Sequence, residues 1–269
     1  MPKILTPGQI EAYRKDGYVA PIRVISTERA AAIRQRIEEF ERSHGAPLSA
    51  TIRKRPHLLF TCLNELMREE RILDAVEDLY GENLLVWSSD LFIKEPADPA
   101  YVSWHQDSTY WGLSSPDVVT AWVAISESDK SNGALEVVPG THLKDQLPHR
   151  DTFAEDNMLS RGQEVAVEVD PNSSVMLELE PGEMSLHHVR LVHGSAPNGS
   201  KTQRRIGCAI RYIPTYVRQL DRQNPASLVR GDDTFRSFEH EPIPTRDMDP
   251  KCVSLHDKTI KMWDVAAAT

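Results

Sequence analysis

The spacing of apolar residues changes near residue 82, from a helical repeat to short alternating runs. Thr6 to Gln9 resembles a capping box with proline at the first helical position, and predicts a helix over 7–16. Apolar residues recur at helical spacing from Thr27 to Ser43, which predicts a second helix. Leu59 to Leu79 predicts one or two short helices that end at Gly81. We therefore expect a mainly helical N-terminal part.

After residue 82 the sequence pattern predicts β-strands. The predicted strands share short length, apolar character and bounding Gly, Pro, Asn or Asp residues; they are 84–87, 91–94, 118–125, 134–138, 165–169, 175–179, 184–192 and 204–213. Strands that follow a helical start predict two packed antiparallel sheets with helices on one side. The expected fold is mainly β with flanking helices, a double-stranded β-helix of the jelly-roll, cupin-like type.

We expect one domain over 1–269, with a mainly helical part at 1–82, a jelly-roll core at 83–213 and a C-terminal extension at 214–269. The polar interval 140–162 is too long for a hairpin turn, and such loops are often lids or binding loops. After residue 213 the chain is polar and rich in proline, which predicts an extended tail over the body.

The amino-acid composition of the chain argues against several classes of binding partner. A formal charge of −9 and a pI near 5.6 argue against nucleic acid or an anionic membrane as a partner, and the local cluster Arg53-Lys54-Arg55 does not reverse this. The three cysteines are widely spaced and form neither a disulfide framework nor a zinc pattern. No apolar stretch approaches the length of a membrane span, and the first residues lack a signal-peptide core. We expect a soluble cytoplasmic protein that acts on a small molecule; its oligomeric state stays open.

The segment Trp104-His105-Gln106-Asp107 carries the clearest chemical signal. Residues i and i+2 of a strand point to one face, so His105 and Asp107 aim an imidazole and a carboxylate at one point. One further histidine would complete the two-histidine, one-carboxylate facial triad of non-haem Fe(II) oxygenases. A His-x-Asp pair alone is weak evidence, because short polar patterns arise by chance.

Further motifs follow in order: Asn132-Gly133, Pro139-Gly140-Thr141-His142, and His193-Gly194-Ser195 with Asn198 and Arg204. With these, Trp104 to Ile213 resembles the phytanoyl-CoA dioxygenase family of Fe(II)/2-oxoglutarate-dependent oxygenases. The opening helix is similar as well. The resemblance implies that His105, Asp107 and His193 bind Fe(II), and that Arg204 binds the distal carboxylate of 2-oxoglutarate. It also implies that Ser195 and Trp122 line the cosubstrate pocket.

The strand over 204–213 offers two candidate arginines. Alternation places Arg204 with Ile206, Cys208 and Ile210, whereas Arg205 shares its face with Gly207, Ala209 and Arg211. If the more apolar face is the barrel interior, Arg204 points inward and supplies the planar donor fork that fits a carboxylate.

Other candidates keep more than one interpretation. His187 would share a face with His193 on one continuous strand, and only the resemblance selects His193. For His142, His187 and His188 we favour structural roles. Trp122 is equally typical of a sheet core, Lys94 is best explained as a solvated strand end, and Trp111 suits either a substrate wall or the core.

The expected reaction couples decarboxylation of 2-oxoglutarate, with O₂, to hydroxylation of an unactivated C–H bond of a small metabolite, releasing succinate and CO₂. A related halogenase is an alternative, but such enzymes replace the carboxylate ligand by a small residue, and Asp107 is present. A second alternative is a cupin-type metalloenzyme that works without 2-oxoglutarate, but the presence of Arg204 argues against it. A third alternative is a non-enzymatic receptor on the same scaffold. The sequence does not identify the substrate. Its determinants are expected in the 140–162 loop, near Lys94 and in the C-terminal extension.

Overall fold

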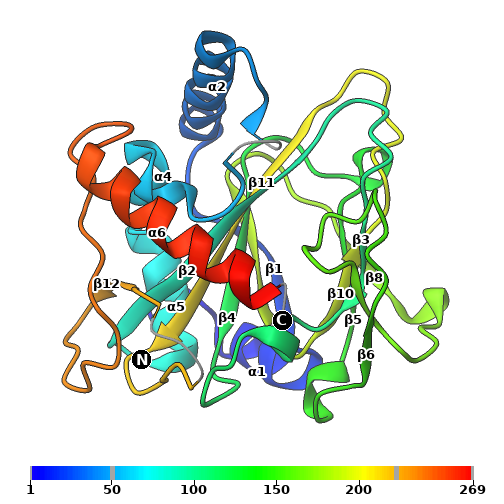
Figure 1. The fold of residues 1–269 in the computed structure, drawn as a ribbon. Coiled ribbons are helices and arrows are strands. Elements are labelled where there is room, and N and C mark those ends of the chain that lie inside the picture. The colour runs from blue at the N-terminus through cyan, green and yellow to red at the C-terminus, as the bar shows by residue number, and fades with distance from the viewer. Residues whose placement is uncertain (1, 49–51, 221–223, 268–269) are drawn as a thin grey trace.

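The computed structural model describes residues 2–48, 52–220 and 224–267. The fold consists of two facing antiparallel sheets with helices packed on the outside of the larger one (Figure 1). The large sheet has the order β1-β9-β4-β11-β2-β12 and the small sheet the order β3-β10-β5-β8. This arrangement confirms the predicted mainly β, jelly-roll class.

The helices are α1 (Pro7–Asp16), α2 (Thr27–His44), α4 (Thr61–Leu66), α5 (Glu70–Tyr80) and α6 (Pro250–Ala267). The first four begin and end close to the predicted positions, whereas α6 was not predicted. The Thr6 hydroxyl accepts from the backbone N–H of Gln9, and the Gln9 side chain accepts from the backbone N–H of Thr6, so the predicted capping box forms. The prediction of an extended tail is wrong over α6, where the chain forms a long C-terminal helix (Figure 1).

The strands of the large sheet are β1 (Tyr18–Arg23), β2 (Leu84–Lys94), β4 (Val119–Ala124), β9 (Glu183–His188), β11 (Arg205–Pro214) and β12 (Ser227–Arg230). Those of the small sheet are β3 (Val102–His105), β5 (Leu135–Val138), β8 (Val175–Leu177) and β10 (Val192–Ser195). A hairpin of β6 (His149–Asp151) and β7 (Gln163–Val165) spans the long polar loop. The turns η1 (Pro56–Leu58), η2 (Asp107–Tyr110), η3 (Lys130–Asn132), η4 (Thr141–Leu143) and η5 (Pro171–Ser173) are short 3₁₀ helices.

Three strand predictions need correction. The run predicted at 165–169 is in a strand only at its first residue, where β7 ends. The separate runs 84–87 and 91–94 form the single strand β2, because Ser88, Ser89 and Asp90 between them continue the pairing with β11. The predicted strand over 184–192 is broken into β9 and β10, which belong to different sheets. His187 and His193 therefore lie on facing sheets and not on one strand.

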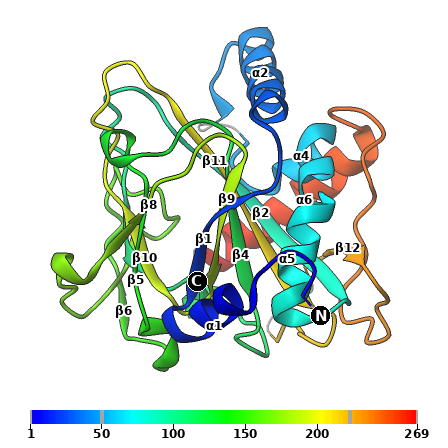
Figure 2. The same ribbon diagram turned by 180° about the vertical axis from the view of Figure 1, so that it is seen from behind.

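The main hydrophobic core lies between the large sheet and the helices (Figures 1 and 2). On β11 the residues Ile206, Cys208, Ile210 and Tyr212 pack into this core. The alternate residues of the same strand face the small sheet. The apolar face of β11 is thus the outer, helix-covered face, and the inner face is left for polar side chains.

Candidate active site

The structure brings His105, Asp107 and His193 together between the two sheets. His105 ends β3, Asp107 begins η2, and His193 lies on β10 directly opposite His105 in the antiparallel register. Their candidate ligand atoms all lie within 4.8 Å of one another. His105 Nε2 is 3.2 Å and His193 Nε2 is 3.9 Å from Asp107 Oδ1. Two imidazoles and a carboxylate on one side of a common point form a facial set of ligands.

Both imidazoles are oriented by the backbone. Nδ1 of His105 lies 2.9 Å from the carbonyl oxygen of Ser103, and Nδ1 of His193 lies 2.8 Å from that of Leu191. Each carbonyl can only accept, so each Nδ1 carries the proton in the neutral ring and each Nε2 presents a lone pair. Two lone pairs then face a carboxylate. This donor arrangement suits a divalent cation between them, and histidine ligands are usually anchored through the other nitrogen in this way.

The charge of the three groups supports the same interpretation. Burial by itself would raise the pKa of Asp107, but His105, His193 and Arg211 outweigh it and hold the pKa far below its usual value. Burial and the neighbouring His105 lower the pKa of His193 well below 6.5. The site therefore holds a charged carboxylate and a neutral imidazole, the protonation states of metal ligands.

The sequence expectation for Arg204 is wrong in orientation. The Arg204 guanidinium pairs with Glu41 on α2 at 2.7 Å and with Glu95 at 2.9 Å, outside the space between the sheets. Arg205 instead lines the cavity that also contains the three candidate ligands. The expectation assumed that the more apolar face of β11 points inward. That face packs against the helices, so the inner face carries Arg205 and Arg211.

Arg205 is the cationic centre of this cavity. It is 2% exposed, donates to the backbone oxygen of Gly133, and has an Nε atom that is buried without a partner in the described part of the chain. Its guanidinium lies 5.4 Å from the ring centre of Trp122. Trp122 and Ser195 both line the cavity, as the sequence resemblance implies.

Lys94 adds a second buried basic group. Its side chain is fully buried and Nζ donates to Ser195 Oγ at 2.7 Å, so the expected solvated strand end is not found. Burial, followed by the charge of Arg205, lowers the pKa of Lys94 to about 6. No ion pair joins Lys94 or Arg205 to a carboxylate among the residues described. A buried guanidinium, next to a buried amine that can take up a proton when an anion binds, forms a pocket suited to a carboxylate ligand.

The other histidines separate into two groups. His142 Nε2 lies 3.1 Å from the carbonyl oxygen of Arg14, and His188 Nδ1 accepts from the backbone N–H of Arg190, which fits structural roles. His187 lines the same cavity as the three candidate metal ligands, and its ring centre is 4.8 Å from that of His193. Its Nδ1 is buried without a partner among the described residues, and burial lowers its pKa to about 4.

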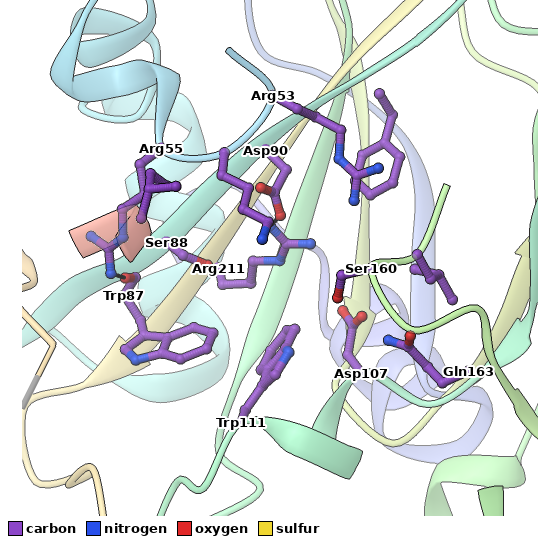
Figure 3. Close-up of a pocket in the computed structure, with 14 residues that line it drawn as sticks. Arg53, Arg55, Trp87, Ser88, Asp90, Asp107, Trp111, Ser160, Gln163 and Arg211 are labelled. Atoms are coloured by element: carbon purple, nitrogen blue, oxygen red, sulfur yellow. Dashed lines mark hydrogen bonds and ion pairs between the residues drawn. The ribbon is translucent and has the colours of Figure 1, made fainter. Parts of the chain in front are cut away.

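A second cavity opens beside the first, and Asp107 and Arg211 line both. Figure 3 shows Arg53 and Arg211 on either side of Asp90, with Trp87 and Trp111 forming an aromatic wall below them. Arg53 was visible in the sequence only as part of a basic cluster. Its place in the cavity follows from the pairing of Lys54 with Asp90 of β2, which no local pattern indicates.

The sequence and fold of this chain are similar to those of known proteins. The family model described as phytanoyl-CoA dioxygenase (PhyH) matches residues 13–206. A protein from Stutzerimonas stutzeri named "Probable alpha-ketoglutarate-dependent hypophosphite dioxygenase" is 32% identical over 170 residues, which are 62% of this chain and 59% of that protein. This chain thus matches less than two thirds of that relative's length.

Solved structures agree over nearly the whole fold. The structure described as "non-heme monooxygenase; ThoJ apo" is 30% identical, has a TM-score of 0.84 and covers 97% of both chains. The structure described as "Non-heme monooxygenase, ThoJ-Ni complex" is 28% identical, has a TM-score of 0.79 and covers 96% of this chain and 98% of that chain. Together with the match to the family model, these similarities show that the chain belongs to the phytanoyl-CoA dioxygenase (PhyH) family.

Proposed function

We propose that this protein is an Fe(II)/2-oxoglutarate-dependent dioxygenase that hydroxylates an unactivated C–H bond of a small metabolite and releases succinate and CO₂. The observation that carries the proposal is the adjacency of two sites. A two-histidine, one-carboxylate set with backbone-anchored rings lies in the same cavity as a buried arginine that lacks an anionic partner. The first suits Fe(II), and the second suits the distal carboxylate of a 2-oxo acid.

His105, Asp107 and His193 would hold the iron. Bound Fe(II) supplies the oxidative chemistry, in which O₂ and the 2-oxo acid are consumed. Three protein ligands leave coordination positions free for a cosubstrate and O₂. The carbonyls of Ser103 and Leu191 fix both imidazole rings, so the ligands do not have to reorganise when the metal binds.

Arg205 takes the cosubstrate role that the sequence resemblance suggested for Arg204. Its fork would bind the distal carboxylate of 2-oxoglutarate, with Ser195 as a further hydrogen-bond donor and the Trp122 ring as a wall. Lys94 holds Ser195 in place and would become positively charged when the carboxylate binds. Buried charge-assisted hydrogen bonds of this kind contribute about 1.5–3 kcal/mol each.

The substrate is expected to enter the second cavity, because Asp107 links it to the metal side. Leu159 and Ser160 of the long loop and Ile260 of α6 line this cavity, so the loop and the C-terminal helix would exclude water from the reaction. The relative from Stutzerimonas stutzeri is named a probable hypophosphite dioxygenase. A small-molecule substrate fits that precedent. We expect the protein to act in the cytoplasm, where its free thiols Cys62, Cys208 and Cys252 stay reduced.

Two alternative activities fit less well. Halogenation needs a coordination position that a carboxylate ligand would occupy, and Asp107 lies in the ligand set. A cupin-type reaction without 2-oxoglutarate would leave the buried side chains of Arg205 and Lys94 without an anionic ligand to bind.

The test is anaerobic titration of Fe(II) and 2-oxoglutarate, read as a weak visible charge-transfer band, followed by O₂ and assay of succinate. A metabolite screen for products that gain one oxygen atom then identifies the substrate. A protein that binds Fe(II) stoichiometrically but produces neither the band nor succinate would contradict the proposal.

No helix in the described part of the chain is both long enough and apolar enough to cross a membrane.

A further inference from the structure

The second cavity has a charged end and an apolar body. Its volume is about 110 Å³. Trp87, Trp111 and Phe92 supply aromatic walls, and the ring centres of the two tryptophans are 4.8 Å apart. The charged end contains Arg53 and Arg211, with Asp90 between them (Figure 3).

The charges at that end do not balance. Arg211 pairs with Asp90, and Asp107 belongs to the metal-ligand set. Arg53 donates through Nη1 to the backbone oxygen of Met158, and its Nε is buried without a partner among the described residues. No carboxylate within the described ranges forms an ion pair with Arg53. Two guanidinium groups therefore lie at this end, and among the described residues the ion pair joins Asp90 to Arg211 and not to Arg53.

The other basic residues of this segment do not change the balance. Arg55 points away from the charged end and forms an ion pair with buried Glu241. Lys54 also interacts with another group of the protein. In the view of Figure 3 the side chains of Arg55 and Arg211 lie on opposite sides of Ser88. Arg53 is therefore the cation of this cluster that lacks an anionic partner.

Arg53 is held in place and is not a mobile surface side chain. The backbone N–H of Leu91 donates to the Arg53 oxygen at 2.9 Å, and that of Arg55 donates to the Ser89 oxygen at 2.7 Å. These bonds attach the segment to β2. The guanidinium lies 5.2 Å from the ring centre of Phe92. Burial and the nearby Arg211 lower the pKa of Arg53, whereas Asp90 raises it. An additional anion would relieve this unfavourable environment.

We propose that the substrate is a small organic acid with an apolar body, and that Arg53, assisted by Arg211, binds its carboxylate. Because the same cavity is lined by Asp107, a molecule held at Arg53 extends its apolar part along the tryptophans towards the metal side. An arginine fork binds a carboxylate through paired N–H donors, which selects a planar anion over a neutral group of equal shape. This inference rests on the proposed function, since it takes the cavity beside the metal ligands as the substrate site.

The experiment compares two probes of the same shape, benzoate and benzamide. Each is titrated calorimetrically into protein that is saturated with Fe(II) and 2-oxoglutarate without O₂, so that the cosubstrate pocket is already filled. The charge-transfer band is recorded in each sample. Trp87 and Trp111 line the cavity, so quenching of tryptophan fluorescence reports occupancy independently. The variants are Arg53→Met, Arg53→Lys and, as a control with the same change in charge, Arg34→Met on the outer helix α2.

The wild-type protein should bind benzoate at least about tenfold more tightly than benzamide. Arg53→Met should remove this preference by weakening benzoate alone, and Arg53→Lys, which keeps the charge but loses the fork, should retain part of it. Arg34→Met should leave both affinities within about twofold, as for a surface substitution. If Arg53→Met does not fold, the affinities of Arg53→Lys and of the wild-type protein for benzoate and benzamide still test the inference.

Equal affinities for the two probes in the wild-type protein, or a preference that survives in Arg53→Met, would overturn the inference. If the charge-transfer band forms normally in that case, the proposed function stands and only the substrate class is wrong. If no band forms in the wild-type protein, the proposed function fails, and the assignment of a substrate fails with it whatever the calorimetry shows.

Discussion

Arg204 and Arg205 are neighbours in the chain, but their guanidinium groups lie on opposite faces of the large sheet. Arg204 reaches Glu41 of α2, and Arg205 lines the cavity that contains the three candidate metal ligands. The alternation of side chains along a strand requires this separation. Which of the two points inward depends on which face of β11 the helices cover.

Arg205→Ala should lower the affinity for 2-oxoglutarate by at least about tenfold, because loss of about 1.4 kcal/mol already has that effect. Arg204→Ala should leave the affinity nearly unchanged and instead reduce stability, because Glu41 and Glu95 lose their partner. Titration of 2-oxoglutarate into both variants with Fe(II) saturating measures the first effect, and urea unfolding the second. A larger loss of affinity for Arg204→Ala would show that the register of β11 is misassigned.

His105→Ala and Asp107→Ala should each abolish the charge-transfer band of the Fe(II)/2-oxoglutarate complex, because each removes a ligand. Circular dichroism should show that both variants fold. His240→Ala is the matched control, since His240 is exposed and pairs with Asp233 away from the site. Asp107→Gly should in addition eliminate hydroxylation, and full turnover by this variant would exclude Asp107 as a ligand.

Gly207→Ala should displace Trp122. A Cβ atom at residue 207 would overlap the indole ring of Trp122, which lies against Arg205. Overpacking of this kind costs about 1–3 kcal/mol of stability. The affinity for 2-oxoglutarate should also fall, because the ring and the guanidinium shift together. A crystal structure with Trp122 unmoved and unchanged affinity would show that the wall is not part of the cosubstrate pocket.

Binding of 2-oxoglutarate should be accompanied by proton uptake at Lys94. The pKa of Lys94 is lowered to about 6 by burial, so the side chain is mostly neutral at pH 7.5 before the anion binds. A bound carboxylate raises this pKa, so the affinity should fall as pH increases above about 6. Calorimetry in buffers with different ionisation enthalpies measures the uptake. Lys94→Met should abolish it, and an unchanged uptake in that variant would assign the proton to another group.

Glu241→Gln should destabilise the protein most at neutral pH. Burial raises the pKa of Glu241, but Arg55 and His57 outweigh it and lower the pKa to about 2. The charged form therefore stabilises the fold above the unfolded-state pKa near 4.5, and this contribution disappears as pH falls towards 2. Breaking such a buried pair costs about 3 kcal/mol. Urea unfolding at pH 7 and pH 3 should show the difference between variant and wild type narrowing at the lower pH; a constant difference would mean that charge is not the cause.

The sequence by itself determined those elements that depend only on residues close together in the chain. The capping box at Thr6 places the start of α1, and helical apolar spacing predicts α2 almost to its last residue. The motif around His105 and Asp107 predicted metal-ligand chemistry only together with the resemblance that added His193. Asp107 begins η2 and does not continue strand β3, so the expected strand alternation is not what aims it at the site. The long polar loop was likewise visible as a source of cavity residues.

Tertiary structure decided what depends on contacts between distant segments. The break between β9 and β10 put His187 and His193 on facing sheets, and the helices covered the apolar face of β11, which turned Arg205 inward. The pairing of Lys54 with Asp90 moved Arg53 from a basic run into a cavity wall. Strand periodicity specifies two faces but not which one is inside, because that choice is made by whichever neighbouring element excludes water from it.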